Sequence, residues 1–315
     1  MQRQEQLSSA RRPFYGLNGD KLAADRILLI ENPADLNIDV GRLRIRRSGT
    51  ADAFVAPTDV GILILHHHTI ALSVNALRVL SSSGACIMVT DESHMPSALM
   101  LPTAANRSTP SRLRRQIDHL VTPIPDALWQ ALVQARIRTQ AATLRALELN
   151  GAMRLVRMVE EVEPGDSTHR EGQAARHYWQ YLFAEFKRKK EGATDGINAR
   201  LNYGYAVLRG LVARELVAAG LSCELGLGHR SMENPFNLAD DFMEPYRFTV
   251  ERHVRQLDCD AELDSASKKD VVKFVESEVT LGKHNYRLLP AVRETIASYV
   301  RILESNKGRL VLPVS

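Results

Sequence analysis

The chain has few cysteines and no long apolar run, and both shortages limit where the protein works. Its 315 residues include three cysteines, and Cys86, Cys223 and Cys259 lie far apart. An odd, scattered set does not fit a disulfide framework or a zinc cluster and is typical of a reducing cytoplasm. The longest apolar run, Val60–Leu65, is far below the roughly 20 residues that a bilayer requires. Residues 1–12 are polar and lack the apolar core of an export signal. We therefore expect a cytoplasmic protein with no membrane partner.

The sequence also lacks the short motifs of several large enzyme classes. It contains no Gly-x-x-x-x-Gly-Lys-Ser/Thr, no dinucleotide-binding fingerprint and no Gly-x-Ser-x-Gly. Nucleotide hydrolysis and esterase chemistry therefore lose support. Hydrophobic residues make up 44% of the chain and charged residues 25%, a balance that excludes disorder and supplies enough apolar side chains for one large or two modest domains.

Positive charge is concentrated rather than abundant. The formal net charge is only +4, from 41 lysines and arginines against 37 acids. Residues 107–157, however, include nine arginines and only three acids, and a second basic cluster occupies residues 187–190. Each cluster is equally consistent with a solvated helix face. Together they favour a polyanion, because guanidinium groups match phosphate oxygens. The densest part, Arg112, Arg114 and Arg115, is the first candidate for DNA contact.

The hydrophobic period changes from two to three or four near residue 102. Before it, branched runs separated by turn residues predict six strands: Arg26–Ile30, Leu36–Val40, Arg42–Arg46, Val60–Leu65, Cys86–Thr90 and Ser97–Leu101. One helix is expected among them, over Ser73–Ser83. Beyond residue 125 the pattern predicts helices: Ala127–Leu149, Ala152–Val162, Thr168–Phe186, Gly196–Ala219, Leu238–Val254, Lys268–Val279 and Asn285–Glu304.

The expected fold class is α+β, with a small β-rich domain followed by a larger all-α domain. We place the β-rich domain at residues 1–102 and the α-helical catalytic domain at residues 126–315. The polar stretch of residues 103–125 contains Pro110, Pro123 and Pro125 and is expected to be a linker or hinge.

Glu171 is the first residue with candidate chemistry. The Thr168-x-x-Glu171 spacing is that of a capping box, in which the glutamate bonds back to the first amide of the helix. The buried stripe of the same helix, with Ala174, Ala175 and Tyr178, nevertheless directs Glu171 inward. A carboxylate there is costly unless a cation offsets its desolvation, so a metal or acid role stays open beside capping.

A Gly-Leu-Gly turn precedes the second candidate, His229. Gly226 and Gly228 make a tight backbone that would let a ligand approach the imidazole. A lone histidine is more often a satisfied polar residue, and this alternative stays open. Arg230, the next residue, suits a phosphate.

The stretch from Asn237 to Arg247 is rich in acids. Asn237 is a natural N-cap, and the positive end of a helix accounts for Asp240 and Asp241. Glu244 lies one turn later, on the same face as these aspartates. Two carboxylates on one face are a plausible ligand pair for a hard cation. Pro245 removes a backbone hydrogen bond within the helical stretch, a local cost that often marks a functional site.

Four ordered motifs resemble the CRISPR-associated protein one family, the spacer-acquisition endonucleases and integrases. They are Thr-His-Arg-Glu-Gly-Gln-Ala-Ala at 168–175, Leu-Asn-Tyr-Gly-Tyr-Ala at 201–206, Gly-Leu-Gly-His at 226–229 and the stretch 237–247. The resemblance covers nearly the whole chain. It implies a β-rich N-terminal domain that mediates dimerisation and an α-helical catalytic domain. It further implies a homodimer bridged by CRISPR-associated protein two.

The resemblance also assigns roles to residues. It implies that Glu171, His229 and Glu244 are catalytic and hold Mg²⁺ or Mn²⁺, with Asp241 as an auxiliary ligand. It places the helix with Asn202, Tyr203 and Tyr205 near the site, and packing is the alternative role for the two tyrosines. The expected DNA contacts are Arg112, Arg114, Arg115, Asn202, Tyr203, Arg230 and Arg247.

The expected function is metal-dependent insertion of short DNA fragments into a CRISPR array, with a 3′-hydroxyl attacking a phosphodiester. Such transesterification conserves bond energy, so it needs no nucleotide cofactor. A metal-dependent DNA nuclease or branched-DNA resolvase would use the same residues with water as the nucleophile. A non-catalytic DNA-binding scaffold is the alternative from another class, in which the acids are helix caps.

Overall fold

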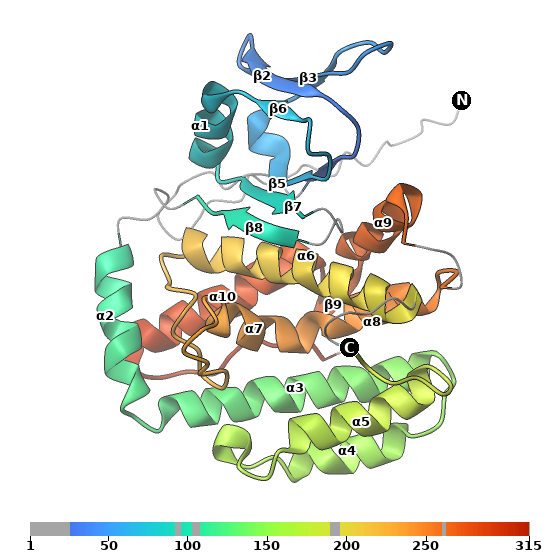
Figure 1. Ribbon diagram of the computed structural model, residues 1–315. Coiled ribbons are helices and arrows are strands. Elements are labelled where there is room, and N and C mark those ends of the chain that lie inside the picture. Colours follow the sequence, from blue (N-terminus) through green and yellow to red (C-terminus); the bar gives the residue numbers. More distant parts are fainter. Residues whose placement is uncertain (1–25, 92–95, 103–107, 190–195, 260–262, 315) are drawn as a thin grey trace, which may run out of the picture.

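The computed structural model describes residues 26–91, 96–102, 108–189, 196–259 and 263–314. It confirms the expected fold class, since two small sheets in the N-terminal part are followed by a mainly helical region. Figure 1 shows the sheets at one end of the molecule, above a larger helical body. None of the helices in the described part of the chain is both long and apolar enough to cross a bilayer.

The first sheet lies between the N-terminal part of the chain and the helical body. Its strands have the order β1-β5-β7-β8; β1, β5 and β7 run parallel and β8 runs antiparallel to β7. These strands are β1 (Arg26–Ile30), β5 (Val60–Leu65), β7 (Cys86–Thr90) and β8 (Pro96–Met100). The central strand β5 is apolar throughout because both faces of the sheet are covered. Ile62 and Ile64 belong to the core of the helical body, while Val60 and Leu63 belong to a separate core beneath helix α1 (Val74–Ser82).

The second sheet has the order β4-β3-β2-β6 and lies at the outer end of the molecule. Its strands are β2 (Asp35–Asp39), β3 (Arg42–Arg46), β4 (Ala53–Val55) and β6 (Ala71–Leu72). The turn between β2 and β3 consists of Val40 and Gly41, both with positive φ, which is the backbone of a tight two-residue hairpin. The sequence did not predict β4 or β6, because two or three residues are too few to show a period.

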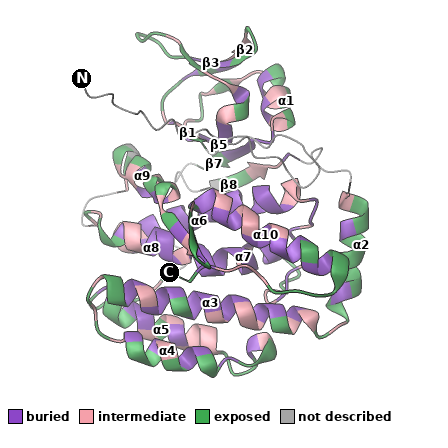
Figure 2. Cartoon of the chain, turned by 180° about the vertical axis from the view of Figure 1, so that it is seen from behind, coloured by how far each residue is buried: buried purple, intermediate pink, exposed green. Residues whose placement is uncertain are grey.

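The helical body is built around two long helices, α3 (Ile124–Ala146) and α6 (Gly196–Ala218). Both are buried on almost every side (Figure 2). Helix α6 lies directly under strands β7 and β8, and α3 packs against the next layer of helices. The other helices are α2 (Thr109–Leu120), α4 (Ala152–Glu160), α5 (Arg170–Leu182), α7 (Asn237–Met243), α8 (Arg247–Arg255), α9 (Ser265–Val272) and α10 (Leu288–Ser305).

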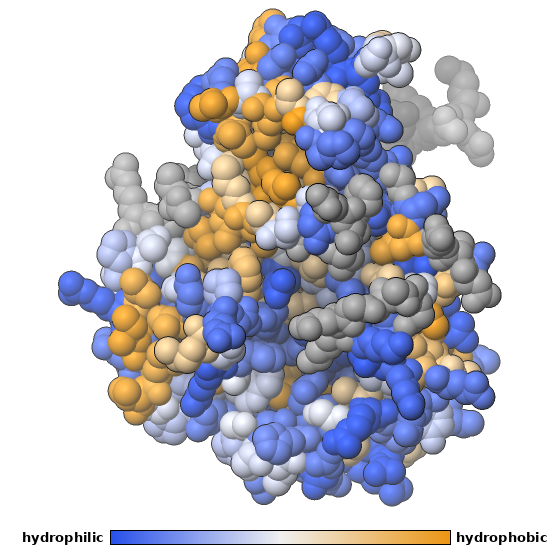
Figure 3. All heavy atoms as spheres, viewed as in Figure 1, coloured by the Kyte–Doolittle hydropathy of each residue, from blue (hydrophilic) through white to orange (hydrophobic). Residues whose placement is uncertain are grey.

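Two parts of the chain differ from the sequence prediction. The expected linker at 103–125 contains α2, which Arg112 anchors to Glu304 of α10; residues 103–107 lie outside the described part. Helix α2 also exposes Leu113, Ile117, Leu120 and Val121, which form a hydrophobic area over this helix in Figure 3. In the region expected to be all-α, strands β9 (Glu278–Leu281) and β10 (His284–Arg287) form a hairpin. Helices were predicted there because Gly282 and its positive φ were not recognised as a turn.

Candidate active site

The candidate residues meet at a cavity of about 660 Å³ in the helical body. Glu171, His229 and Glu244, which the sequence places up to 73 positions apart (244 − 171), all line it. Its walls come from α3, α5, α6, the turn at 226–230 and the junction of α7 with α8. Other lining residues are Arg136, Gly172, Ala175, Arg176, Trp179, Arg188, Asn202, Tyr205, Ala206, Arg209, Asp240, Met243 and Arg247.

Glu171 is free to face this cavity because another residue caps its helix. Both carboxylate oxygens of Asp166 accept hydrogen bonds from the start of α5, from the amides of Arg170 (2.7 Å) and Glu171 (3.1 Å). Within the described residues the carboxylate of Glu171 makes no hydrogen bond to the helix start, so the capping-box alternative is wrong. Burial, and then the neighbouring Glu244, raise the pKa of Glu171, while Arg136, Arg247 and His229 oppose them.

The imidazole of His229 is oriented by Asp241. Oδ1 of Asp241 lies 2.8 Å from Nδ1 of His229 and accepts the backbone amide of the same residue at 2.9 Å. Its Oδ2 accepts the amides of Leu227 (2.5 Å) and Gly228 (3.2 Å). The Nδ1 contact leaves Nε2 of His229 as the ring nitrogen available to the cavity. The hydrogen bond and the nearby carboxylates outweigh burial and raise the pKa of His229.

This geometry corrects the role expected for Asp241 as an auxiliary metal ligand. Its side chain is completely buried and does not line the cavity. Both oxygens are already occupied by the donors of the 227–229 turn. Asp241 therefore acts on His229, which is the position that a carboxylate takes behind a ligating histidine.

The two glycines before His229 are required by packing. A Cβ on Gly228 would lie 2.2 Å from the indole of Trp129, and one on Gly226 would lie 2.1 Å from the carbonyl oxygen of His229. The space that the sequence analysis left for a ligand is thus filled by Trp129, whose ring meets the imidazole edge-on at 5.4 Å.

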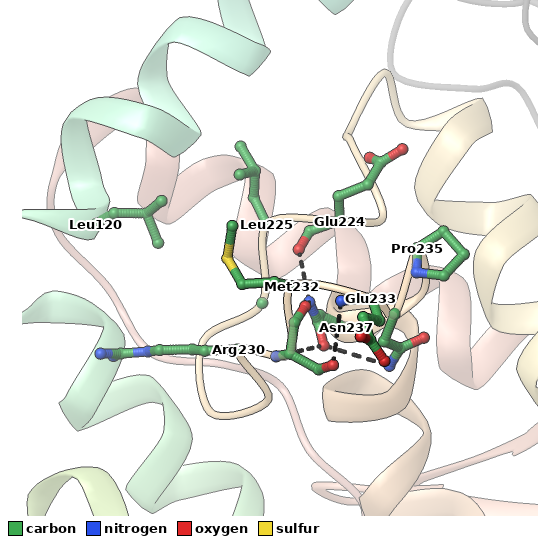
Figure 4. A pocket seen from close by; sticks show the side chains of 11 residues that line it. Leu120, Glu224, Leu225, Arg230, Met232, Glu233, Pro235 and Asn237 are labelled. Atoms are coloured by element: carbon green, nitrogen blue, oxygen red, sulfur yellow. Dashed lines mark hydrogen bonds between the residues drawn. The ribbon is translucent and has the colours of Figure 1, made fainter.

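Asn237 fixes the loop that follows His229. Its Nδ2 donates to the carbonyl oxygens of Glu224 (3.1 Å) and Ser231 (2.8 Å), and its Oδ1 accepts the amide of Ser231. These bonds appear in Figure 4, which shows a neighbouring pocket of about 640 Å³. Asn237 is the first residue of α7 and not its N-cap, contrary to the sequence prediction.

Glu244 opens a short 3₁₀ turn, Glu244–Tyr246, between α7 and α8. Pro245 fits there at little cost, because the first turn of a helix does not use its amide. The Oε1 atom of Glu244 accepts from Nη2 of Arg247 at 2.8 Å. Its Oε2 is buried, lies 3.5 Å from Nε of Arg136 and has no hydrogen-bond partner in the described structure.

The expected DNA-contact residues divide into three groups: those that line the cavity, those exposed elsewhere and those that are buried. Asn202 and Arg247 line the cavity. Arg230 is exposed, pairs with Asp126 at 3.1 Å and lines the neighbouring pocket instead. Arg114 and Arg115 are exposed on α2 and do not line the cavity; Arg115 donates to the carbonyl oxygens of Leu303 and Glu304.

Two of the expected DNA contacts are wrong. Arg112 is buried, with its guanidinium bound to Glu304 (2.9 Å) and to the carbonyl oxygen of Ala219 (2.8 Å). Tyr203 is fully buried on the opposite face of α6, where its hydroxyl lies 2.7 Å from Nε2 of His66. Neither side chain can meet DNA without unfolding its surroundings.

Sequence reasoning named Arg247 but did not assign Arg136 and Arg188 to the cavity, which both also line. Arg188 and Arg247 lie over the ring of Tyr205, at 5.4 Å and 4.7 Å from its centroid, and Arg188 also donates to Oδ1 of Asn202 at 2.6 Å. The sequence counted Arg136 and Arg188 only as members of basic stretches. Their contacts come from other elements, so no local pattern could have assigned them.

Glu171, His229 and Glu244 are the kinds of side chain that bind a divalent cation, although Glu244 is paired with Arg247 in this structure. Two carboxylates and an imidazole are ligands for Mg²⁺ or Mn²⁺, and Oε2 of Glu244 is a buried acceptor without a hydrogen bond. Within the described part of the chain, no three His, Cys, Asp or Glu side chains already form a group that could hold a metal. The Glu244 carboxylate lies against Arg247 at 2.8 Å and Arg136 at 3.5 Å.

Comparison with known proteins identifies the family. The model of the family "CRISPR associated protein Cas1" matches residues 27–270. A CRISPR-associated endonuclease Cas1 from Neisseria meningitidis is 34% identical over 296 residues, which cover 91% of this chain and 95% of that protein. Among solved structures, a casposase bound to an integration product superposes with a TM-score of 0.77 at 18% identity, covering 91% of this chain and 92% of that one. A CAS1 protein from Thermotoga maritima gives 0.75 at 14% identity, covering 90% and 99%. The chain therefore belongs to the Cas1 family.

Proposed function

We propose that this chain is a divalent-metal-dependent DNA endonuclease and integrase of CRISPR adaptation. The observation that carries the proposal is the convergence of Glu171, His229 and Glu244 on one cavity that Arg188 and Arg247 also line. Carboxylates and imidazole are cation ligands, and guanidinium groups bind phosphate. The name of the 34% identical relative, an endonuclease, and the casposase bound to its integration product support this activity.

The reaction is a transesterification at phosphorus. The 3′-hydroxyl oxygen of a short DNA fragment forms a new bond to a phosphorus atom at the boundary of a repeat. The bond between that phosphorus and the 3′-oxygen of the array strand breaks, and the departing oxygen takes up a proton. One phosphodiester replaces another, so no nucleotide cofactor is consumed.

Glu171, His229 and Glu244 are the groups that would hold the cation. Bound there, Mg²⁺ or Mn²⁺ would offset charge at the attacked phosphate and favour the ionised form of the attacking hydroxyl. Arg247, Arg188 and Asn202 would hold phosphate oxygens beside it. Asp241 keeps the imidazole in the tautomer that presents Nε2.

The proposed partners are DNA, a second copy of the chain and Cas2. The solved structures support the first and the last: a DNA complex of TtCas1 superposes with a TM-score of 0.57 at 19% identity. A Cas6-RT-Cas1–Cas2 complex gives 0.73 at 17% identity. The homodimer rests on the resemblance of the sequence motifs.

A second candidate reaction uses water in place of the 3′-hydroxyl. The same three residues would then cleave DNA or resolve branched DNA, and the endonuclease name of the relative favours it. A DNA-binding scaffold without catalysis needs the acids to be caps, and Asp166 already takes that role for Glu171.

The decisive experiment offers two duplexes to the chain and its Cas2 partner, together with a supercoiled plasmid that carries a repeat. One duplex ends in a free 3′-hydroxyl and the other in a blocked 3′ end. Integration predicts joined product only from the free hydroxyl, and only with Mg²⁺ or Mn²⁺. Plasmid cleavage at equal rates with both duplexes, without joining, would establish the hydrolytic alternative. DNA binding without any metal-dependent product would leave the scaffold.

A further inference from the structure

A completely buried carboxylate, Glu251 of α8, lies behind the active-site cavity without lining it. It binds the Arg136 guanidinium in a two-pronged geometry, Nη1 at 3.1 Å from Oε2 and Nη2 at 2.5 Å from Oε1. The hydroxyl of Tyr205 donates to the same Oε1 at 2.7 Å. Glu251 is therefore satisfied by two elements, α3 and α6, that both form walls of the cavity.

Arg136 connects this pair to the candidate metal ligand Glu244. Its Nη atoms are held by Glu251, which leaves Nε directed to Oε2 of Glu244 at 3.5 Å. Neither Nε nor Oε2 has a hydrogen-bond partner within the described residues. The Oε2 atom of Glu244 thus faces the Arg136 guanidinium, whose orientation is set by Glu251, while Arg247 holds Oε1 at 2.8 Å.

Little freedom remains for Arg136 to move. Its side chain is 4% exposed, and its guanidinium lies 5.9 Å from the ring centroid of Tyr178. A planar guanidinium bound at two nitrogens cannot rotate without breaking both bonds. Apolar residues would fill such a buried position at least as stably, so stability alone gives no reason for an ion pair here.

The charges of the neighbouring carboxylates and guanidinium groups give a reason for placing Arg136 beside Glu244. Glu171 and Glu244 repel each other, and Arg136 and Arg247 oppose that repulsion. With Glu251 included, the five groups carry a net charge of −1 (three carboxylates, two guanidinium groups). A divalent cation held by Glu171 and Glu244 would offset their mutual repulsion.

We propose that Arg136 and Glu251 are positioning residues, which hold the Glu244 carboxylate in the orientation that the metal requires. The inference rests on the proposed metal-dependent function. Glu251 holds Arg136, and Arg136 together with Arg247 holds Glu244. A purely structural pair would tie α3 to α8 without influence on metal affinity.

The test measures Mn²⁺ affinity of the full chain in the absence of DNA, by titration followed by electron paramagnetic resonance. Glu251→Gln keeps the volume and removes the charge, and we expect it to weaken Mn²⁺ binding by about tenfold, as loss of a group behind a metal ligand commonly does. The melting temperature is recorded for each variant. DNA joining at saturating Mn²⁺ should recover in part, with the KM for DNA unchanged.

Glu215 supplies the matched control. It is as deeply buried as Glu251, pairs with Arg214 and with Arg293 at 2.9 Å, and does not line the cavity. Glu215→Gln should lower the melting temperature and leave Mn²⁺ affinity unchanged. If Glu251→Gln does not fold, Arg136→Lys tests the same inference. The lysine keeps the buried positive charge but lacks the planar group that lies against both Glu251 and Glu244. We expect Arg136→Lys to bind Mn²⁺ severalfold more weakly.

The outcomes separate this inference from the function on which it rests. Weaker Mn²⁺ binding in Glu251→Gln but not in Glu215→Gln supports the positioning role. Unchanged affinity in Glu251→Gln, or in Arg136→Lys where that variant decides, overturns it if His229→Ala still weakens binding. If His229→Ala binds Mn²⁺ like the unchanged chain, the proposed metal site itself is wrong.

Discussion

Glu171 and Glu244 occupy the same cavity but differ in their neighbours. Glu244 is paired with Arg247 and lies beside Arg136. Glu171 makes no ion pair within the described residues, and burial together with Glu244 raises its pKa. At neutral pH an ionised Glu171 therefore lowers the free energy of unfolding, whereas Glu244 compensates the charges of the buried Arg136 and the partly buried Arg247.

These neighbours predict opposite effects of two matched substitutions on stability. Glu171→Gln should raise or preserve the melting temperature, because it removes the repelling charge. Glu244→Gln should lower it, because Arg247 loses its counter-ion and Arg136 keeps only Glu251. Both should reduce strand joining by orders of magnitude at saturating DNA. Thermal unfolding and single-turnover joining of the two variants, with Asp240→Asn as a mild control, decide the point. A stable and fully active Glu244→Gln would remove Glu244 from the ligand set.

Glu215 connects stability to pH. Despite burial, Arg214 and Arg293 lower its pKa below the usual 4.5. An acid whose pKa is lower in the folded state contributes stability above its unfolded pKa and loses it as pH falls. The free energy of unfolding should therefore decline as pH drops below about 4.5, and the decline should be shallower in Glu215→Gln. Urea titrations of both chains between neutral and acidic pH would measure this; parallel curves would contradict it.

At the scale of elements, α2 is an anchored helix and its arginines are not equivalent. Arg112→Ala should cost roughly 1–3 kcal/mol, because it removes a buried side chain that binds Glu304 and the partly buried carbonyl oxygen of Ala219. Arg114→Ala, on the exposed side, should change stability by less than about 0.5 kcal/mol. Denaturant unfolding of the two variants tests this. Equal stabilities would show that α2 does not depend on the Arg112 contacts.

Two tyrosines of helix α6 face opposite sides of the helix and contact different parts of the molecule. Tyr205 lines the cavity, whereas Tyr203 meets His66 at the end of β5. Tyr203→Phe should cost about 1 kcal/mol for the lost hydrogen bond and leave DNA affinity unchanged at fixed salt. Tyr205→Phe serves as the comparison, since it removes a donor from Glu251 within the cavity wall. Weaker DNA binding by Tyr203→Phe at unchanged stability would restore it as a DNA contact.

At the scale of the molecule, the exposed positive charge lies on the α3–α4 layer more than on α2. Arg154 and Arg157, one turn apart on α4, are exposed, and no ion pair involves them within the described residues. Each phosphate contact contributes about −0.9 to the slope of log affinity against log salt on duplex DNA. The double change of Arg154 and Arg157 to Gln should therefore make this slope less negative by up to about 1.8. The matched double change of Arg42, at the start of β3, and Arg47, just after its end, should leave the slope unaltered. Equal slopes for the two doubles would place DNA elsewhere.

The division into domains is less sharp than the change of period indicates. Residues 103–125 contain α2, and the β1-β5-β7-β8 sheet gives one face to the helical core. The proposed boundaries at 102 and 126 therefore stay predictions about independent folding. A sheet covered on both faces couples the two parts, because Ile62 and Leu63 lie in different cores.

The sequence by itself determined the elements and the three central candidates. Strand and helix periods are local properties of hydrophobic side chains, so all six predicted strands and most predicted helices begin and end within a few residues of their expected bounds. The motifs around Glu171, His229 and Glu244 predicted residues that do share a cavity. The short strands β4 and β6 and the β9–β10 hairpin were not predicted, because their formation depends on pairing with residues that a short stretch of sequence does not include.

Only the tertiary structure decided what each side chain does. Asp241 and Glu244 lie one turn apart, yet one faces the 227–229 turn and the other the cavity. Arg136 and Glu251 are separated by 115 positions and form one buried pair. Sequence spacing gives the direction of a side chain relative to its own helix axis. The partner that a side chain contacts depends on how separate elements pack. The packing of α3, α6 and α8 against one another cannot be predicted from any local sequence pattern.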